Sequence, residues 1–365
     1  MKTDVLKLKL SGGRSYPIYI GPGTVKVAAD ASGLKKVESK ALIVTDRNVA
    51  AAHLKTLEKV FAAAGVDYSA LILPPGERQK NFGTYKKIVG NLAAMADKRD
   101  LTVVAFGGGV VGDIAGFAAA TYRRGISLVQ IPTTLLANVD SSVGGKTGID
   151  LPEGKNLVGS FYQPKAVIID TDFLSTLPMR ELRCGMAEVI KYGFIMDAKF
   201  ASHLDKSIER LLGLDKGELT KAIYRCCELK AKVVSVDERD EKGVRAILNF
   251  GHTFAHAIET ACGYAKYRHG EAVGIGMACA ADLSAKLGFL DGGAARRIED
   301  LIIRSGLPTS IEGAKADELM NIMLKDKKTR AGKMRFILLD RIGHAFISDL
   351  PKAADVRGVL KKRIR

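Results

Sequence analysis

Residues that could bind a metal ion lie in three places in the second half of the chain. Glu188 ends the run Gly185-Met186-Ala187-Glu188, His269 precedes Gly270-Glu271, and His252 and His256 stand four residues apart. At that spacing, two side chains on one helix face the same way. Two histidines and a carboxylate are a common ligand set for zinc, and an open fourth position makes such a site catalytic. These residue types indicate a metal site, with ordinary core or surface histidines as the alternative.

A glycine-rich turn in the first half could bind a dinucleotide. Gly107, Gly109 and Gly112 fit the G-x-G-x-x-G spacing, in which missing side chains let backbone N–H groups and a helix N-terminus approach a pyrophosphate. An apolar strand pattern at 101–106 precedes the turn, and a small-residue helix pattern at 114–120 follows it. This context favours a dinucleotide site over a tight structural turn.

A second glycine-rich segment, 140–148, contains Gly144-Gly145-Lys146-Thr147. It differs from a P-loop because position 140 is Asp where the first glycine should stand, and no helix pattern follows Lys146 before Pro152. We therefore exclude a nucleotide triphosphatase. Together with Gly154-Lys155-Asn156, the segment is interpreted as a loop that carries lysines and hydroxyls toward an anion.

Alternating strands and helices must position the first-half motifs. After an N-terminal hairpin that includes 15–20 and a helix at 25–31, the patterns predict strands at 41–46, 68–73, 101–106, 127–131 and 166–170, with helices at 49–64 and 85–94. Such alternation predicts a mostly parallel sheet covered on both faces, with ligands at the C-terminal strand ends. Asp46, Gly107–Gly112 and Thr133-Thr134 would lie there. Asp46 is either the partner of a ribose hydroxyl or a helix N-cap, and it precedes the glycine turn, unlike the ordinary Rossmann order.

From about Leu174, helix patterns replace strand patterns. They predict helices at 179–196, 199–212, 216–237, 253–262, 271–287, 294–305 and 316–326, and a hairpin of 334–339 with 345–347. Lys325–Arg330 is interpreted as a solvated loop. The predicted fold is α/β plus all-α, with a Rossmann-like, mostly parallel sheet domain at 1–175 and a helical metal- and substrate-binding domain at 176–365.

Composition narrows the class of partner. The chain has 365 residues, 47% of them hydrophobic, and a net charge of +16, which attracts nucleic acid, acidic membranes and small anions alike. Its basic residues are spread along the sequence, and no nucleic-acid-binding motif or membrane-length apolar run is present. Five cysteines without a C-x-x-C pair indicate a reducing compartment. We expect a cytoplasmic protein with a small anionic substrate, and neither nucleic acid nor membrane as partner.

Seven motifs of the chain can be compared with known families: Gly107–Gly112, Pro132–Ala137, Asp140–Thr147, Gly154–Asn156, Gly185–Glu188, Leu248–Thr253 and His269–Val273. In these motifs, in their order, and over nearly its whole length, the chain resembles the 3-dehydroquinate synthase family of the sugar phosphate cyclase superfamily.

The resemblance implies an NAD-binding first domain, a second domain that binds Zn²⁺ or Co²⁺, and a homodimer. It implies Glu188, His252 and His269 as metal ligands and leaves His256 for substrate, whereas spacing alone would make both helical histidines ligands. Implied NAD contacts are Asp46, Asn48, Glu77, Lys80, Gly108, Gly109, Val110, Asp113, Thr133, Thr134, Lys146, Lys155, Phe173 and Thr176. Implied substrate-binding residues are Arg124, Asp140, Asn156 and Lys230, and implied catalytic residues are Lys146, Lys191, Glu241, Arg245, Asn249 and His256.

The implied reaction converts 3-deoxy-D-arabino-heptulosonate 7-phosphate into 3-dehydroquinate and phosphate. It proceeds by transient NAD-dependent oxidation, phosphate elimination, re-reduction and an internal aldol closure, as part of the shikimate pathway. Such a substrate needs cations at both ends. We expect the phosphate at Arg124, Lys146, Asn156 and His256, and the carboxylate at Lys230, Arg245 and Asn249.

Two departures from the family pattern leave alternatives open. The loop Asp237–Gly243 is one residue longer, so Asp240 competes with Glu241. His344 follows Gly343 where the family has a phosphate-binding lysine, so the contact is weaker or a lysine of 325–333 replaces it. The competing functions are a related sugar phosphate cyclase with a carboxylate-free substrate, a metal-dependent polyol dehydrogenase and a nucleic-acid-binding protein.

Overall fold

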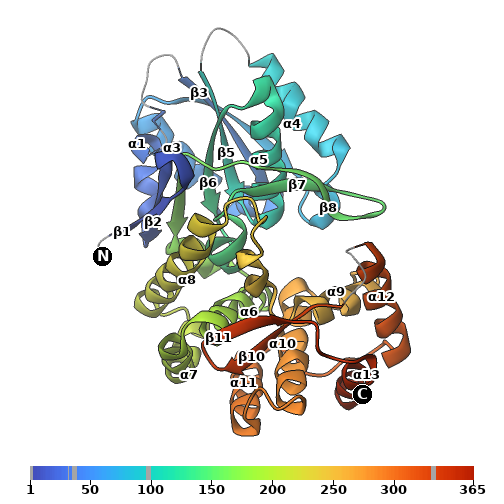
Figure 1. The fold of residues 1–365 in the computed structure, drawn as a ribbon. Coiled ribbons are helices and arrows are strands. Elements are labelled where there is room, and N and C mark those ends of the chain that lie inside the picture. Colours follow the sequence, from blue (N-terminus) through green and yellow to red (C-terminus); the bar gives the residue numbers. More distant parts are fainter. Residues whose placement is uncertain (1–2, 32, 35–38, 96–99, 330–333) are drawn as a thin grey trace. The chain divides into compact units, whose positions relative to one another are not determined.

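The computed structural model describes residues 3–31, 33–34, 39–95, 100–329 and 334–365 (Figure 1). The chain divides into two compact units. Unit 1 comprises Met1–Pro178 and Leu219–Arg239, and unit 2 comprises Met179–Glu218 and Asp240–Arg365.

This division differs from a simple cut at residue 175 because most of α8 (Lys216–Val236) belongs to unit 1. There the Lys230 ammonium pairs with the Asp140 carboxylate, and the Cys227 thiol donates to the Asn138 carbonyl at 3.4 Å. Both partners lie in the segment after β6, so α8 returns the chain to the first unit.

A seven-stranded sheet forms the centre of unit 1, in the order β1-β2-β9-β6-β5-β3-β4. Its strands are β1 (Asp4–Lys9), β2 (Ser15–Gly21), β3 (Ser39–Asp46), β4 (Asp67–Leu73), β5 (Asp100–Gly107), β6 (Ser127–Pro132) and β9 (Ala166–Asp170). Each pair of neighbours is parallel except the hairpin of β1 and β2. The predicted mostly parallel sheet is confirmed.

Successive apolar residues of a strand point to opposite faces of the sheet, so they fill a core on each face. Leu42 and Val44 pack on the face covered by α4 (Phe82–Ala94) and α5 (Gly109–Thr121), whereas Ala41 and Ile43 pack on the face covered by α1 (Ala28–Ala31) and α3 (Lys55–Ala63) (Figure 1). A strand buried on both faces reads as a continuous apolar run, as this one does.

The segment after β6 differs from the prediction. Lys146 and Asn156 lie in an antiparallel hairpin of β7 (Lys146–Leu151) and β8 (Gly154–Phe161), not in a glycine-rich loop. A Cβ on Gly148 would lie 2.6 Å from the Val158 carbonyl oxygen, so this glycine permits close pairing of two strands. Sequence reasoning took glycines as a loop signal where they serve a tight hairpin.

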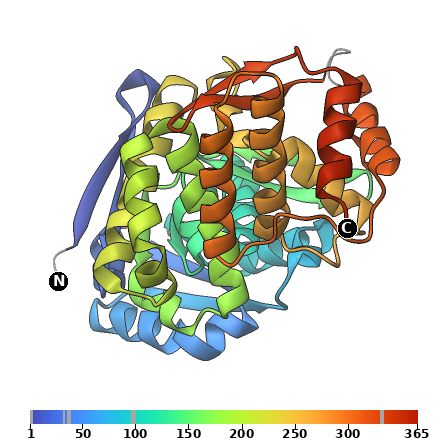
Figure 2. The same ribbon diagram turned by 90° about the horizontal axis from the view of Figure 1, so that it is seen from below.

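Unit 2 is organised around α10 (His269–Lys286), which contacts α6 (Met179–Met196), α9 (His252–Ala261), α11 (Gly292–Arg304) and α13 (Ala353–Arg363). Figure 2 shows α10 and α11, in orange, running side by side. The remaining elements are α7 (Ala198–Leu212), α12 (Ala316–Thr329) and a hairpin of β10 (Phe336–Arg341) with β11 (His344–Ser348). The predicted helical second half is confirmed, with element ends within two or three residues.

Two features of unit 2 depart from the prediction. Helix α13 was not predicted, although its buried Val356, Val359 and Leu360 have helical spacing. Helix α12 continues to Thr329, so the predicted loop at Lys325–Arg330 begins as helix, and the side chains of 326–333 lie outside the described residues. Among the described helices, none has the length and apolarity to cross a membrane.

Candidate active site

Three helices of unit 2 bring Glu188, His252 and His269 together. Glu188 comes from the middle of α6, His252 is the first residue of α9 and His269 the first of α10. One ligand atom from each lies within 4.8 Å of the other two. The Nε2 atoms of His252 and His269 lie 3.8 and 3.9 Å from Oε1 of Glu188. Ligand atoms about 2.1 Å from a tetrahedral zinc ion are ~3.4 Å apart, so a small contraction would complete the site.

The surroundings of Glu188 also fit a cation. The residue is fully buried, and its carboxylate oxygens accept no hydrogen bond from the part of the chain that the structure describes. Lys191, one turn later on α6, forms an ion pair with it. A buried carboxylate needs compensation, and here Lys191 lies at Oε2 while the Nε2 atoms of the two histidines lie near Oε1, where an ion could be shared.

Hydrogen bonds from Nδ1, the ring nitrogen that faces away from Glu188, orient both histidines. Nδ1 of His252 lies 3.2 Å from the Phe250 carbonyl oxygen, and Nδ1 of His269 lies 3.2 Å from Oε1 of Glu259. Both partners can only accept, so Nδ1 carries the hydrogen and the Nε2 lone pairs point toward Glu188. This tautomer is the one that a metal ligand requires.

Electrostatics separate the two histidines. Burial, reinforced by the Lys191 charge, holds the pKa of His252 well below its ordinary value. Burial also acts to lower the pKa of His269, but the hydrogen bond and charge of Glu259 outweigh it and raise that pKa. A neutral and a more basic imidazole therefore face one carboxylate.

Glycines permit the close helix packing that brings the ligands together. A Cβ on Gly270 would lie 2.2 Å from the Cys184 carbonyl oxygen on α6, and a Cβ on Gly276 would lie 2.1 Å from the Gly251 carbonyl oxygen before α9. Gly251 has φ +81°, which other residues rarely adopt. Only glycine fits these crossings, which set His269 beside Glu188 and His252.

The other predicted catalytic residues of unit 2 lie on the elements around this cluster. His256, one turn after His252 on α9, is exposed, and its ring centroid is 5.8 Å from that of His252. Arg245 is buried and Asn249 exposed in the short helix Val244–Asn249, while Glu241 is exposed before it. Asp240 adopts φ +56°. Nδ1 of His344 lies 2.9 Å from a carboxylate oxygen of Asp340.

The glycine turn of unit 1 joins β5 to α5. Gly108 is the N-cap of α5, and Gly109 and Val110 open its first turn, whose N–H groups point away from the helix. Thr133 follows the neighbouring strand β6, and its buried hydroxyl has no hydrogen-bond partner among the described residues. A helix N-terminus beside an unsatisfied hydroxyl fits the pyrophosphate of a dinucleotide.

A buried lysine connects the predicted cofactor residues with the β7–β8 hairpin. The Lys80 ammonium donates to the Asp113 carboxylate at 2.8 Å and to the side-chain oxygen of Asn156. Asp150 accepts the Asn156 N–H at 2.7 Å and donates its own N–H to the Lys80 carbonyl at 2.8 Å. Asn156, predicted as a phosphate contact, therefore holds Lys80 in this structure.

Other predicted cofactor residues lie near this cluster, near the glycine turn or at the end of β3. Lys155 lies 3.6 Å from Glu77, and Thr134 accepts the Ala137 N–H at 3.2 Å. The Asp46 carboxylate accepts the N–H groups of Asn48 and Val49 at 2.8 and 3.2 Å, so it caps the following helix.

Phe173 and Thr176 both contact His53. The His53 ring lies 4.7 Å from that of Phe173, and its Nε2 lies 2.6 Å from the Thr176 hydroxyl. Burial lowers the pKa of His53.

The predicted substrate cations of unit 1 differ in their surroundings. Lys230 is buried and pairs with Asp140, whereas Lys146 and Arg124 are exposed. Arg124 ends a short helical turn, with φ +64°.

Sequence reasoning missed Glu259, Asp150 and His53. Glu259 stands seven residues after His252, two helical turns along the same face of α9, so its spacing could have revealed it. Asp150 and His53 gave no comparable signal, because their partners are distant in sequence.

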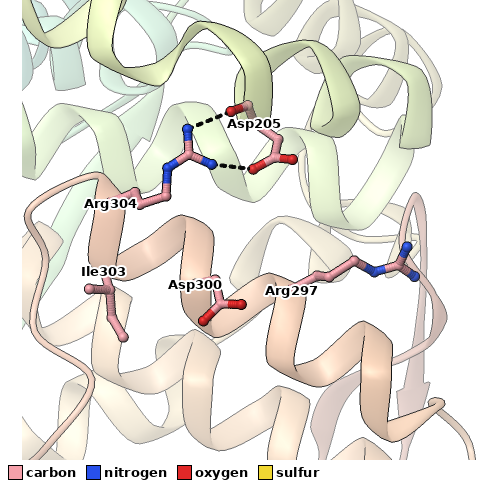
Figure 3. Close-up of a pocket in the computed structure, with 5 residues that line it drawn as sticks. All are labelled: Asp205, Arg297, Asp300, Ile303 and Arg304. Carbon is pink, nitrogen blue, oxygen red and sulfur yellow. Dashed lines mark hydrogen bonds and ion pairs between the residues drawn. The ribbon is translucent and has the colours of Figure 1, made fainter.

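A surface pocket elsewhere in unit 2 contains none of the predicted site residues (Figure 3). It is lined by Asp205, Arg297, Asp300, Ile303 and Arg304. Arg304 donates to Asp205 at 2.6 Å and to Glu209 at 2.8 Å, so its charge is balanced within the protein.

Comparisons with known proteins agree over most of the chain. Residues 70–184 match the family model for the 3-dehydroquinate synthase N-terminal region, and residues 185–329 match that for the C-terminal region. The chain is 49% identical over 346 residues to a 3-dehydroquinate synthase of Acidithiobacillus ferrooxidans, covering 94% of each chain. It is 47% identical over 348 residues to one of Neisseria meningitidis serogroup C, covering 95% of this chain and 96% of the other.

A solved structure shares the fold at lower identity. ValA, the 2-epi-5-epi-valiolone synthase of Streptomyces hygroscopicus, was solved with NAD⁺ and Zn²⁺ bound. It aligns with a TM-score of 0.88 and 28% identity, covering 96% of both chains. Two family models that together span most of the chain, and relatives at nearly half identity, agree with the arrangement of residues described above: the chain belongs to the 3-dehydroquinate synthase family.

Proposed function

We propose that the chain converts 3-deoxy-D-arabino-heptulosonate 7-phosphate into 3-dehydroquinate and phosphate, a step of aromatic amino acid biosynthesis. The observation that carries the proposal is the cluster of Glu188, His252 and His269 in a chain 49% identical to a protein of that activity. NAD and Zn²⁺ or Co²⁺ would be the cofactors.

The three clustered side chains would hold the ion, and the glycine turn with Lys80, Asp113 and Thr133 would hold NAD. When bound, NAD accepts and returns a hydride, and the ion polarises the oxygen of the alcohol that is oxidised. Lys191, which lies beside Glu188, and Glu241 would also be catalytic residues. Lys146, Arg245, Asn249 and His256 would complete the catalytic set by binding the substrate.

Cations and amides would fix the two ends of the substrate. Arg124, Lys146, Asn156 and His256 would bind the phosphate, and Lys230, Arg245 and Asn249 the carboxylate. Arg245 is assigned to the carboxylate because a guanidinium can bind a carboxylate through two parallel hydrogen bonds. In the structure, Lys230 pairs with Asp140 and Asn156 accepts a hydrogen bond from Lys80.

A related cyclase that acts on a carboxylate-free sugar phosphate is the alternative. It is less well supported, because identity to the valiolone synthase is 28% against 49% for the dehydroquinate synthase. A metal-dependent polyol dehydrogenase is a second alternative, and it would accumulate NADH.

The test is to incubate the purified protein with NAD, Zn²⁺ or Co²⁺ and the heptulosonate phosphate. We expect phosphate and 3-dehydroquinate in equal amounts, without net NADH, because the cofactor is regenerated in each turnover. A heptulose phosphate without the carboxylate is the control substrate, and it should react far more slowly than the heptulosonate phosphate. Faster reaction of that substrate, or steady NADH accumulation, would contradict the proposal.

We further infer a homodimer that works in the cytoplasm and binds neither nucleic acid nor membranes. The family resemblance supports the dimer. All five cysteines are thiols outside any disulfide and four are buried, which supports a reducing compartment.

A further inference from the structure

We propose that Glu259 is a positioning residue that fixes the metal-binding orientation of His269 and strengthens it as a ligand. The inference rests on the proposed metal site. It assigns a role to a side chain that does not reach the ion itself.

Geometry supports this role first. Oε1 of Glu259 lies 3.2 Å from Nδ1 of His269, while Nε2 of the same ring faces Glu188 at 3.9 Å. A carboxylate cannot donate, so the Nδ1 hydrogen is directed at Glu259 and the Nε2 lone pair at the proposed ion. The ring is therefore held in one tautomer and one orientation.

Burial makes the contact stronger than a surface pair would be. Glu259 is only 5% exposed, and an ionised carboxylate in that position is retained when a donor or cation compensates it. Its hydrogen bond to the imidazole increases the electron density on Nε2, as carboxylate partners of metal-bound histidines do.

The two histidines differ in this support. His252 donates to a neutral backbone carbonyl, whereas His269 donates to a charged side chain. Helix α9 thus contributes one ligand directly through His252 and orients another through Glu259, two turns later. A substitution can remove the Glu259 side chain that binds His269, but it cannot remove the backbone carbonyl that binds His252.

The test compares Glu259→Gln and Glu259→Ala with a matched control, Glu271→Gln. Glu271 lies in the first turn of α10 and binds Arg180 at 2.7 Å, so its substitution removes a nearby charge without touching the His269 ring. Affinities for Zn²⁺ and Co²⁺ are measured by competition with a chelator, and the visible spectrum of the Co²⁺ protein reports the ligand geometry.

We expect Glu259→Ala to bind metal about 10- to 100-fold more weakly and to change the Co²⁺ spectrum. Glu259→Gln should lose less, because its amide oxygen still accepts from Nδ1. The control should stay close to wild type in both readouts. At saturating metal, Glu259→Gln should recover most of its turnover.

Two results would overturn the inference. Metal affinity and Co²⁺ spectra of both Glu259 variants equal to wild type would show that the residue does not act on the ligand. A loss in Glu271→Gln as large as in Glu259→Ala would attribute the effect to general charge. Absence of metal binding by the wild-type protein would instead refute the proposed function along with the inference.

Discussion

At the residue scale, ligand chemistry could be predicted from types and spacing, but the choice among histidines could not. His252 and His256 share a helical face, and spacing alone selects both. In the structure His269, distant in sequence, lies beside His252, and its Nε2 atom faces Glu188. Tertiary packing decides this choice, and a local pattern contains no information on it. Glu259 differs from His269 in this respect, because its spacing of seven residues from His252 on the same helix could have revealed it from the sequence.

A pH prediction follows for Asp113. Burial raises the pKa of this carboxyl to about 6, although the Lys80 charge acts to lower it. Because the folded-state pKa lies above the ordinary value of about 4, the protonated form favours folding. This contribution is fully present below about pH 4 and is lost as the pH rises through about 6.

Asp113→Asn cannot titrate and is the control. Between pH 4 and 7, the free energy of unfolding of the wild type should fall relative to Asp113→Asn by on the order of 2 kcal/mol. Denaturant unfolding at a series of pH values measures the difference. Parallel pH profiles of the two proteins would refute it.

At the element scale, periodicity located nearly every strand and helix that positions the site. Ala166–Asp170 and Met179–Met196 have the predicted bounds. The misses were elements in which glycine or charge obscured the period: the β7–β8 hairpin and α13. Glycine marks loops, tight strand pairing and close helix crossings alike, and only the partner across the contact distinguishes them.

Helix crossings lead to a prediction for Gly270→Ala. The added methyl would lie 2.2 Å from a backbone oxygen of α6, which cannot rotate away. Overpacking of this kind costs about 1–3 kcal/mol and would separate His269 from Glu188. We expect a lower thermal midpoint and weaker metal binding.

Gly274→Ala is the matched control on the same helix. Its new methyl would lie 3.2 Å from Cβ of Leu307 and 3.4 Å from the Pro308 carbonyl oxygen, a much milder approach than 2.2 Å, and alanine favours helix. Calorimetry and chelator competition should show a much smaller effect than for Gly270→Ala. Equal losses in the two variants would show that the close approach to α6 does not hold the ligands.

At the scale of the whole molecule, the sequence predicted the fold class and the family, because long motifs occur in family order. The division of the chain into two units was harder to predict from the sequence. Helix α8 follows helices of the second unit without a change in pattern, and only its contacts with Asp140 and Asn138 assign it to the first. Unit 1 offers the glycine turn and unit 2 the ligand cluster, so each would contribute one of the two groups that the reaction requires.

The most direct test of the central claim is an anomalous-scattering map at the zinc edge from crystals of the zinc-loaded protein. We predict one strong peak about 2.0–2.2 Å from a Glu188 oxygen and from Nε2 of both His252 and His269, with an open coordination position. A zinc peak bound by other residues, or one that includes His256 in place of His269, would contradict the account.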